Sequence, residues 1–166
     1  MKKQLLFAFA VLLLMVACST DNNSTITISG ITESNAYGER TGEVDETDWT
    51  GDTYLPDTVY PLFNFSDDVD YTNASVAVVQ ILEYPNPVDS EFRLNFNVSC
   101  QTVVKFIIVD ENLNVYLAQT LKLDVGSNTV AIPTDGLKSK YYRVYYAFYD
   151  SFKSIYFNGH GDILKN

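Results

Sequence analysis

Few residues of this chain have the chemistry that catalysis needs. The 166 residues include one histidine, His160, and two cysteines, Cys18 and Cys100. A serine or cysteine nucleophile needs a base held close to it, and His160 lies in a glycine-rich stretch, residues 158–162, that we interpret as a loop near the C-terminal end. Zinc is not expected with one histidine and one free thiol, and no phosphate-binding or dinucleotide-binding motif is present. The sequence therefore predicts no catalytic residues, no cofactor and no enzymatic activity.

Two clusters of carboxylates, at residues 45–48 and 67–70, are the features that most resemble a metal site. Their oxygen atoms are hard ligands of the kind that Ca²⁺ prefers. Neither cluster has the ligand spacing of an EF-hand loop, and clustered carboxylates on a surface are usually solvated. We therefore predict no metal site.

The aromatic run at residues 141–149 is the best candidate for a contact surface. In a strand, alternate side chains point to the same face, and here one such set contains Tyr141, Arg143, Tyr145 and Tyr149. Exposed tyrosines around an arginine would suit a glycan or a protein partner. The alternative is that these side chains pack across neighbouring strands and cover the sheet.

The first 18 residues indicate where the protein is delivered. Lys2 and Lys3 form a short basic start, and an uncharged apolar run then reaches Ala17, directly before Cys18. This order is typical of a secretory signal rather than a spanning helix. The cysteine after a small residue resembles a bacterial lipoprotein signal, and the resemblance implies that residues 1–17 are removed and that Cys18 is acylated, for example with palmitate. We therefore expect a lipid anchor in the cell envelope, on the outer membrane and facing either the periplasm or the surface.

Charge divides the remaining chain into two regions. The formal net charge is −10, and loss of Lys2 and Lys3 with the signal makes it −12, which argues against nucleic-acid binding. Residues 33–70 hold 11 acidic residues and one basic residue, whereas residues 71–166 are nearly balanced. We interpret residues 18–56 as a polar, acidic and largely irregular leader that acts as a spacer. Trp49 is the exception, and we expect it to pack on the domain.

Residues 57–166 have the pattern of a β-protein. Phe92, Leu94, Phe96 and Val98 alternate with polar residues, as in a strand with one buried and one wet face. Short runs of this kind recur with turn residues between them, at residues 59–65, 74–83, 91–98, 103–109, 115–123, 129–132, 141–149 and 153–157. Such spacing favours an all-β, immunoglobulin-like antiparallel sandwich of about seven strands.

Four segments resemble the C-terminal sorting domain of type IX secretion substrates and related small immunoglobulin-like secreted domains. They are Tyr84-Pro85-Asn86-Pro87-Val88 before an alternating strand, the strand and turn from Phe106 to Val115, the Val125–Val130 hairpin, and the aromatic strand after Leu137. The resemblance covers residues 84–157. It implies the sandwich fold and, as one alternative function, recognition by type IX export machinery.

Three functional hypotheses remain open from the sequence alone. The preferred one is a non-catalytic lipoprotein whose sandwich is a binding or structural module for a protein or glycan partner at the cell envelope. The second is the secretion-related domain, and the third is an enzyme with an unrecognised site.

Overall fold

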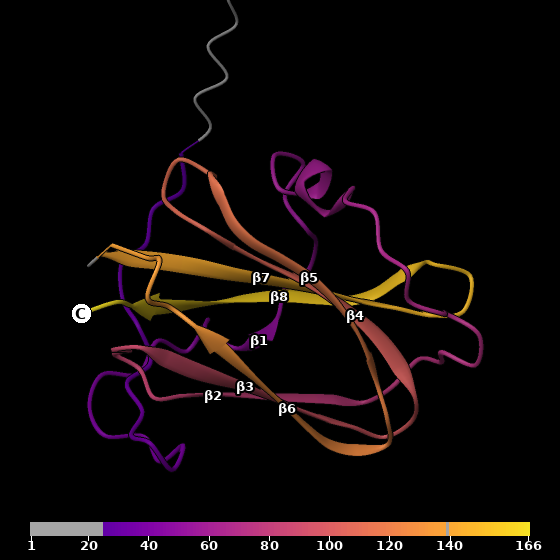
Figure 1. The fold of residues 1–166 in the computed structure, drawn as a ribbon, viewed down its shortest axis with the longest axis horizontal. Helices are drawn as coiled ribbons and strands as arrows, with labels where there is room; N and C mark the ends of the chain where they lie inside the picture. Colours follow the sequence, from indigo (N-terminus) through magenta and orange to yellow (C-terminus); the bar gives the residue numbers. More distant parts are fainter. Residues whose placement is uncertain (1–24, 139) are drawn as a thin grey trace, which may run out of the picture.

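The computed structural model describes residues 25–138 and 140–166. The predicted signal peptide and Cys18 lie outside these residues. The described chain is an antiparallel, immunoglobulin-like β-sandwich (Figure 1). Its elements are β1 (Thr50–Gly51), the 3-10 helix η1 (Tyr60–Phe63), β2 (Val79–Tyr84), β3 (Glu91–Val98), β4 (Thr102–Val109), β5 (Val115–Leu123), β6 (Gly126–Pro133), β7 (Tyr141–Tyr149) and β8 (Ile155–Leu164). The predicted fold class is therefore confirmed.

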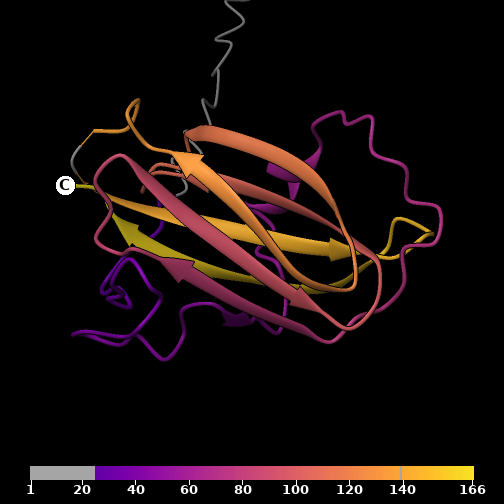
Figure 2. The same ribbon diagram turned by 60° about the horizontal axis from the view of Figure 1, so that its bottom comes forward.

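The strands form two sheets that pack face to face. One sheet has the order β1-β8-β7-β4-β5 and the other has the order β2-β3-β6. Figure 2 shows the three-stranded sheet crossing in front of β7 and β8. Within residues 25–138 and 140–166, no helix has the length and apolar character needed to cross a membrane.

The core between the sheets follows from the alternation that the sequence shows. Every second residue of β3 is buried, because its apolar side chains point toward the other sheet while its polar ones face solvent. The strand β4 is buried at every position. Such continuous burial requires that the five-stranded sheet be covered on both faces.

The second cover comes from the segment between β1 and β2. Its side chains pack against those of β4 and β7 on the outer face of the five-stranded sheet. This outer apolar cluster contains Val59, Phe63, Tyr71, Ala74, Val103, Ile107, Val109, Tyr145, Ala147 and Tyr149. Figure 1 shows η1 on the side of this sheet that faces away from the three-stranded sheet. The buried Lys105 of β4 binds this segment to the sheet. Its Nζ lies 2.7 Å from a carboxylate oxygen of Asp67 and donates to the carbonyl of Phe65.

The expected edge strand at residues 59–65 is wrong. Residues 59–65 contain the 3-10 helix η1 rather than an edge strand. Pro61 stands in the first turn of this helix, where its missing N–H is not needed.

The described part of the acidic leader, residues 25–56, has little regular structure but lies packed on the sandwich rather than acting as a spacer. Ile31, Thr32, Asp48 and Trp49 are buried, so the expected packing of Trp49 is confirmed. The side chain of Asn86 connects the segment to the sheet, because its amide donates to the carbonyls of Thr32 and Asp162. Buried backbone groups find hydrogen-bond partners in this way. The composition of the leader alone did not reveal that it packs on the sandwich.

Candidate functional site

The register of β7 and β8 places four polar or aromatic side chains together on the outer face of the five-stranded sheet. Arg143 lies opposite Asp162, and Tyr145 lies opposite His160. Opposed residues of neighbouring antiparallel strands have adjacent side chains. Of these four residues, Tyr145 also belongs to the outer apolar cluster. The site therefore lies at the margin of the segment that covers this face.

The glycines around His160 serve close packing and not a loop. A Cβ on Gly159 would lie 2.0 Å from the carbonyl oxygen of Thr50, and a Cβ on Gly161 would lie 2.3 Å from the ring of Trp49. The sequence interpretation of residues 158–162 as a loop is therefore wrong, because the glycines let β1 and Trp49 approach the inner face of β8. Residue His160, on the alternate face, is held within a strand.

The pair of Arg143 and Asp162 is the most tightly bound part of the site. The arginine donates from Nε and Nη2 to the two carboxylate oxygens, both at 2.6 Å. Burial by itself would lower the pKa of Arg143, but the hydrogen bonds and the charge of Asp162 raise it above its ordinary value. A bidentate contact of this kind fixes the plane of the guanidinium, which also lies over the ring of Tyr145 at 5.9 Å.

A second layer of buried groups holds Asp162 in place. The backbone N–H of Asp162 donates to Asp48 Oδ1 at 3.0 Å, and Asp48 Oδ2 accepts from the N–H of Thr32. Burial, with the nearby charge of Asp162, raises the pKa of Asp48 to about 6. The N-terminal segment and β8 thus share one carboxylate.

The ring of His160 is oriented by Asp52. The distance from His160 Nδ1 to Asp52 Oδ2 is 2.8 Å. An ionised carboxylate can only accept a hydrogen bond, so Nδ1 carries the proton and, in the neutral ring, Nε2 remains an acceptor. This arrangement has the form of a histidine–carboxylate pair, although the side-chain hydrogen bonds of His160 within the described residues reach Asp52 alone.

A pocket of about 300 Å³ lies over these groups. It is lined by Asp52, Thr53, Tyr54, Pro56, Arg143, Tyr145 and His160. The side chain of Tyr54 is 72% exposed and forms part of the pocket rim. Asp52 and Arg143 are the acidic and basic residues that line the pocket, and the guanidinium of Arg143 is already paired with the buried carboxylate of Asp162.

The predicted contact surface survives only in part. Arg143 and Tyr145 line the pocket, but Tyr145 is 2% exposed and Tyr149 is 9% exposed. Both rings belong to the outer apolar cluster, because residues 59–74 cover this part of the sheet. Of the four residues, Tyr141 is exposed, and it lies outside the pocket. The alternative of packing that covers the sheet therefore holds for Tyr145 and Tyr149.

The sequence did not indicate that His160, Asp52 and Tyr54 belong to one site. The signal available was a single histidine flanked by two glycines, a pattern that also fits a loop. The separation of 108 residues between Asp52 and His160 left no local motif to detect.

The other candidate residues, Cys100 and the two acidic clusters, make contacts within the fold. The Sγ of Cys100 lies 3.2 Å from the carbonyl oxygen of Val76. In the two acidic clusters, Asp45 accepts from Thr47 and Asp67 pairs with Lys105. Across the part of the chain that the structure describes, no group of three or more histidine, cysteine, aspartate or glutamate side chains is arranged to hold a metal ion.

Comparison of this chain with protein-family models, curated proteins and solved structures gives no match.

Proposed function

We propose that this chain is a lipid-anchored, non-catalytic binding module of a bacterial cell envelope, and that it binds a neutral glycan in the pocket over Arg143 and His160. The anchor follows from the resemblance of residues 1–18 to a lipoprotein signal. The pocket is the observation that carries the binding function.

A sugar fits this pocket because of its combination of polar and aromatic groups. Ligand sites commonly join apolar walls with a few fixed polar groups. Here Arg143 and His160 are each oriented by a carboxylate, and Tyr54 supplies aromatic surface. Fixed planar groups can hydrogen-bond to hydroxyls without first becoming ordered, which lowers the cost of binding.

Internal charge pairing favours a neutral ligand over an acidic one. The charge of Arg143 is compensated by Asp162 at 2.6 Å, so the guanidinium is not a free cation for a phosphate or carboxylate. The carboxylate of Asp52, which lines the pocket, repels a second negative group.

The residues that carry the resemblance to sorting domains have roles within the fold. The amide of Asn86 joins the leader to β8, and Asp110 organises the turn between β4 and β5 by accepting the N–H groups of Asn112 and Asn114. These roles account for the motif as a feature of the sandwich. The secretion-related function stays a prediction.

The binding proposal is tested with a glycan array and titration calorimetry on the full chain in detergent. The probes are neutral oligosaccharides and, for comparison, sulfated and uronic-acid-containing ones. We expect binding to neutral glycans that Tyr54→Ala weakens at least about fivefold, the factor that corresponds to a loss of about 1 kcal/mol. The control is Tyr37→Ala, because Tyr37 is 86% exposed and lies outside the pocket. Absence of binding to neutral glycans, or equal loss in both variants, contradicts the proposal.

The anchor is tested separately by metabolic labelling with an alkyne palmitate analogue. Label that enters the wild-type chain and is absent from Cys18→Ser supports acylation at Cys18. Equal labelling of both proteins, or none in the wild type, excludes it.

A further inference from the structure

Two strand edges lie side by side on one flank of the sandwich, and no strand of the described residues pairs with either of them. β5 is the last strand of its sheet and β6 is the last strand of the other, and the two are joined by the short connection at residues 124–125. On the opposite flank, the leader lies against β2, where Ser34 Oγ donates to the carbonyl of Glu83. The seam between β5 and β6 is therefore the open side of the described fold.

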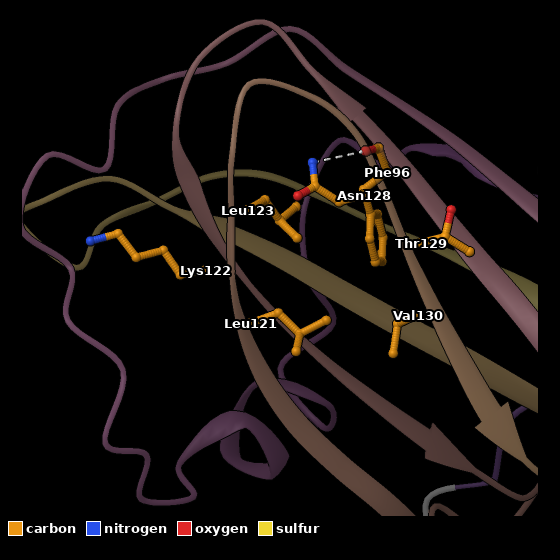
Figure 3. Close-up of a pocket in the computed structure, with 7 residues that line it drawn as sticks. All are labelled: Phe96, Leu121, Lys122, Leu123, Asn128, Thr129 and Val130. Atoms are coloured by element: carbon orange, nitrogen blue, oxygen red, sulfur yellow. Dashed lines mark hydrogen bonds between the residues drawn. The ribbon is translucent and has the colours of Figure 1, made fainter.

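Two apolar hollows lie along this seam. The larger one, of about 340 Å³, is lined by Phe96, Leu121, Lys122, Leu123, Asn128, Thr129 and Val130. Figure 3 shows Phe96, Leu121 and Val130 around the space between the two strands. The smaller one, of about 170 Å³, is lined by Ile108, Tyr116, Leu117, Pro133, Gly136 and Leu137.

The spacing of the hollows matches the repeat of a β-strand. Leu117 borders one hollow and Leu121 borders the other, and both point toward the core between the sheets. Four residues of strand span roughly 13 Å, with side chains at i and i+4 on the same face. A strand added to the edge of β5 would fill both hollows if it carried large apolar residues four positions apart.

Most of the edge of β5 lacks the usual protection against strand addition. Free edges are commonly blocked by lysine, proline or inward-pointing charges. Residues 115–121 contain no charged residue and no proline, and Lys122, near the end of the strand, is engaged by Asp70 and the carbonyl of Thr72. The formal charge of the whole chain is −10. The neutral edge is thus a place where two acidic copies can meet without strong repulsion.

We propose that the occupant of this edge is β5 of a second copy, paired antiparallel about a two-fold axis at Gln119. In this register Leu117 of each copy lies opposite Leu121 of the other. Each leucine then faces the hollow beside its opposite residue. The two leucines of one copy therefore fill the two hollows of the other copy, and the reverse. A closed two-fold interface needs this self-complementarity.

Gln119 suits the position on the axis. It pairs with Phe106 in the register of β4 and β5, so its side chain points to the same face as Leu117 and Leu121. A primary amide both donates and accepts, and two such amides that meet at a two-fold axis can bond to each other. The five-stranded sheets of the two copies become one continuous sheet.

The first test measures the mass of the full chain in detergent by light scattering and sedimentation velocity over a concentration series. We expect a dimer for the wild type and at least a tenfold weaker association for Gln119→Glu at pH 7.5, because two carboxylates then meet at the axis. Association of this variant recovers at pH 4, where carboxylates take up protons. The matched control is Gln80→Glu on β2, an outer strand of the other sheet on the opposite flank, where Gln80 is exposed.

The second test uses a disulfide across the axis. In a Cys100→Ser background, we expect Gln119→Cys to give a covalent dimer on mild oxidation, since opposed residues of an antiparallel pair come close enough to bond. Gln80→Cys is the control that stays monomeric on gels. A wild-type chain that remains monomeric at all concentrations, a dimer that is unaffected by Gln119→Glu, or failure of the Gln119→Cys pair to crosslink overturns the proposal.

Discussion

Glu83 gives the sharpest test of the electrostatics of this sandwich. Its side chain is 3% exposed, it shares the inward face of β2 with Val79 and Ile81, and its Oε1 has no hydrogen-bond partner among the described residues. Burial raises its pKa from 4.5 to about 8, and the nearby Asp48 adds to the effect. The folded chain therefore keeps this proton at pH values where the unfolded chain has lost it.

The raised pKa makes stability fall as the pH rises. Between pH 4.5 and pH 8 the folded state binds more protons than the unfolded state, so the free energy of unfolding decreases by about 1.4 kcal/mol for each pH unit. Glu83→Gln removes this ionisation and keeps the size of the side chain. We expect the variant to be more stable than the wild type by about 3 kcal/mol at pH 7, and nearly equal to it at pH 4.

The assay is urea denaturation followed by tryptophan fluorescence at several pH values between 4 and 8. Titration of Asp48 occurs in both proteins, so the difference between their two curves isolates Glu83. The control is Glu46→Gln, which changes an exposed glutamate and should alter stability by less than about 0.5 kcal/mol. A constant difference between Glu83→Gln and the wild type across this pH range would refute the reasoning.

Two further substitutions test the contacts that shape the fold. In Gly161→Ala the new Cβ meets the ring of Trp49 at 2.3 Å. We expect the free energy of unfolding to fall by about 2 kcal/mol and the emission of the single tryptophan to shift to the red. In the control Gly136→Ala nothing lies within 4 Å of the new Cβ, so stability and emission stay unchanged. Asp110 accepts from the N–H groups of Asn112 and Asn114 and pairs with Lys140 at 3.0 Å, and although burial opposes this, these bonds hold its pKa well below the ordinary value. For Asp110→Asn we expect a loss of about 3 kcal/mol in urea denaturation at pH 7. The loss shrinks as the pH falls below 4, because Asp110 then takes up a proton in the unfolded wild-type chain while the folded chain still keeps it ionised. An undiminished loss at low pH, or an equal loss in the exposed control Asp135→Asn, contradicts this account.

The turn at Asp110 shows how local prediction can miss a backbone detail. The sequence places a turn at residues 110–114, which is confirmed. Asparagine takes left-handed backbone angles at modest cost, so Asn114 is a residue of this turn that can adopt them. The positive φ occurs instead at Leu113, with a value of 59°. The carboxylate of Asp110 holds both ends of this turn, and such bonds can impose a conformation that leucine alone does not favour.

The sequence by itself determined the sandwich, the approximate limits of β3, β4, β5 and β7, and the burial of Trp49. These features depend on alternation, turn residues and apolar size, which act over a few neighbouring positions. The tertiary structure alone decided that residues 59–74 cover the outer face of the five-stranded sheet and that Tyr145 is buried beneath them. It also turned the glycines at 159 and 161 into contact points for β1 and Trp49, and so placed His160 beside Asp52. These outcomes depend on segments about a hundred residues apart meeting in one register, and no local pattern encodes such a meeting.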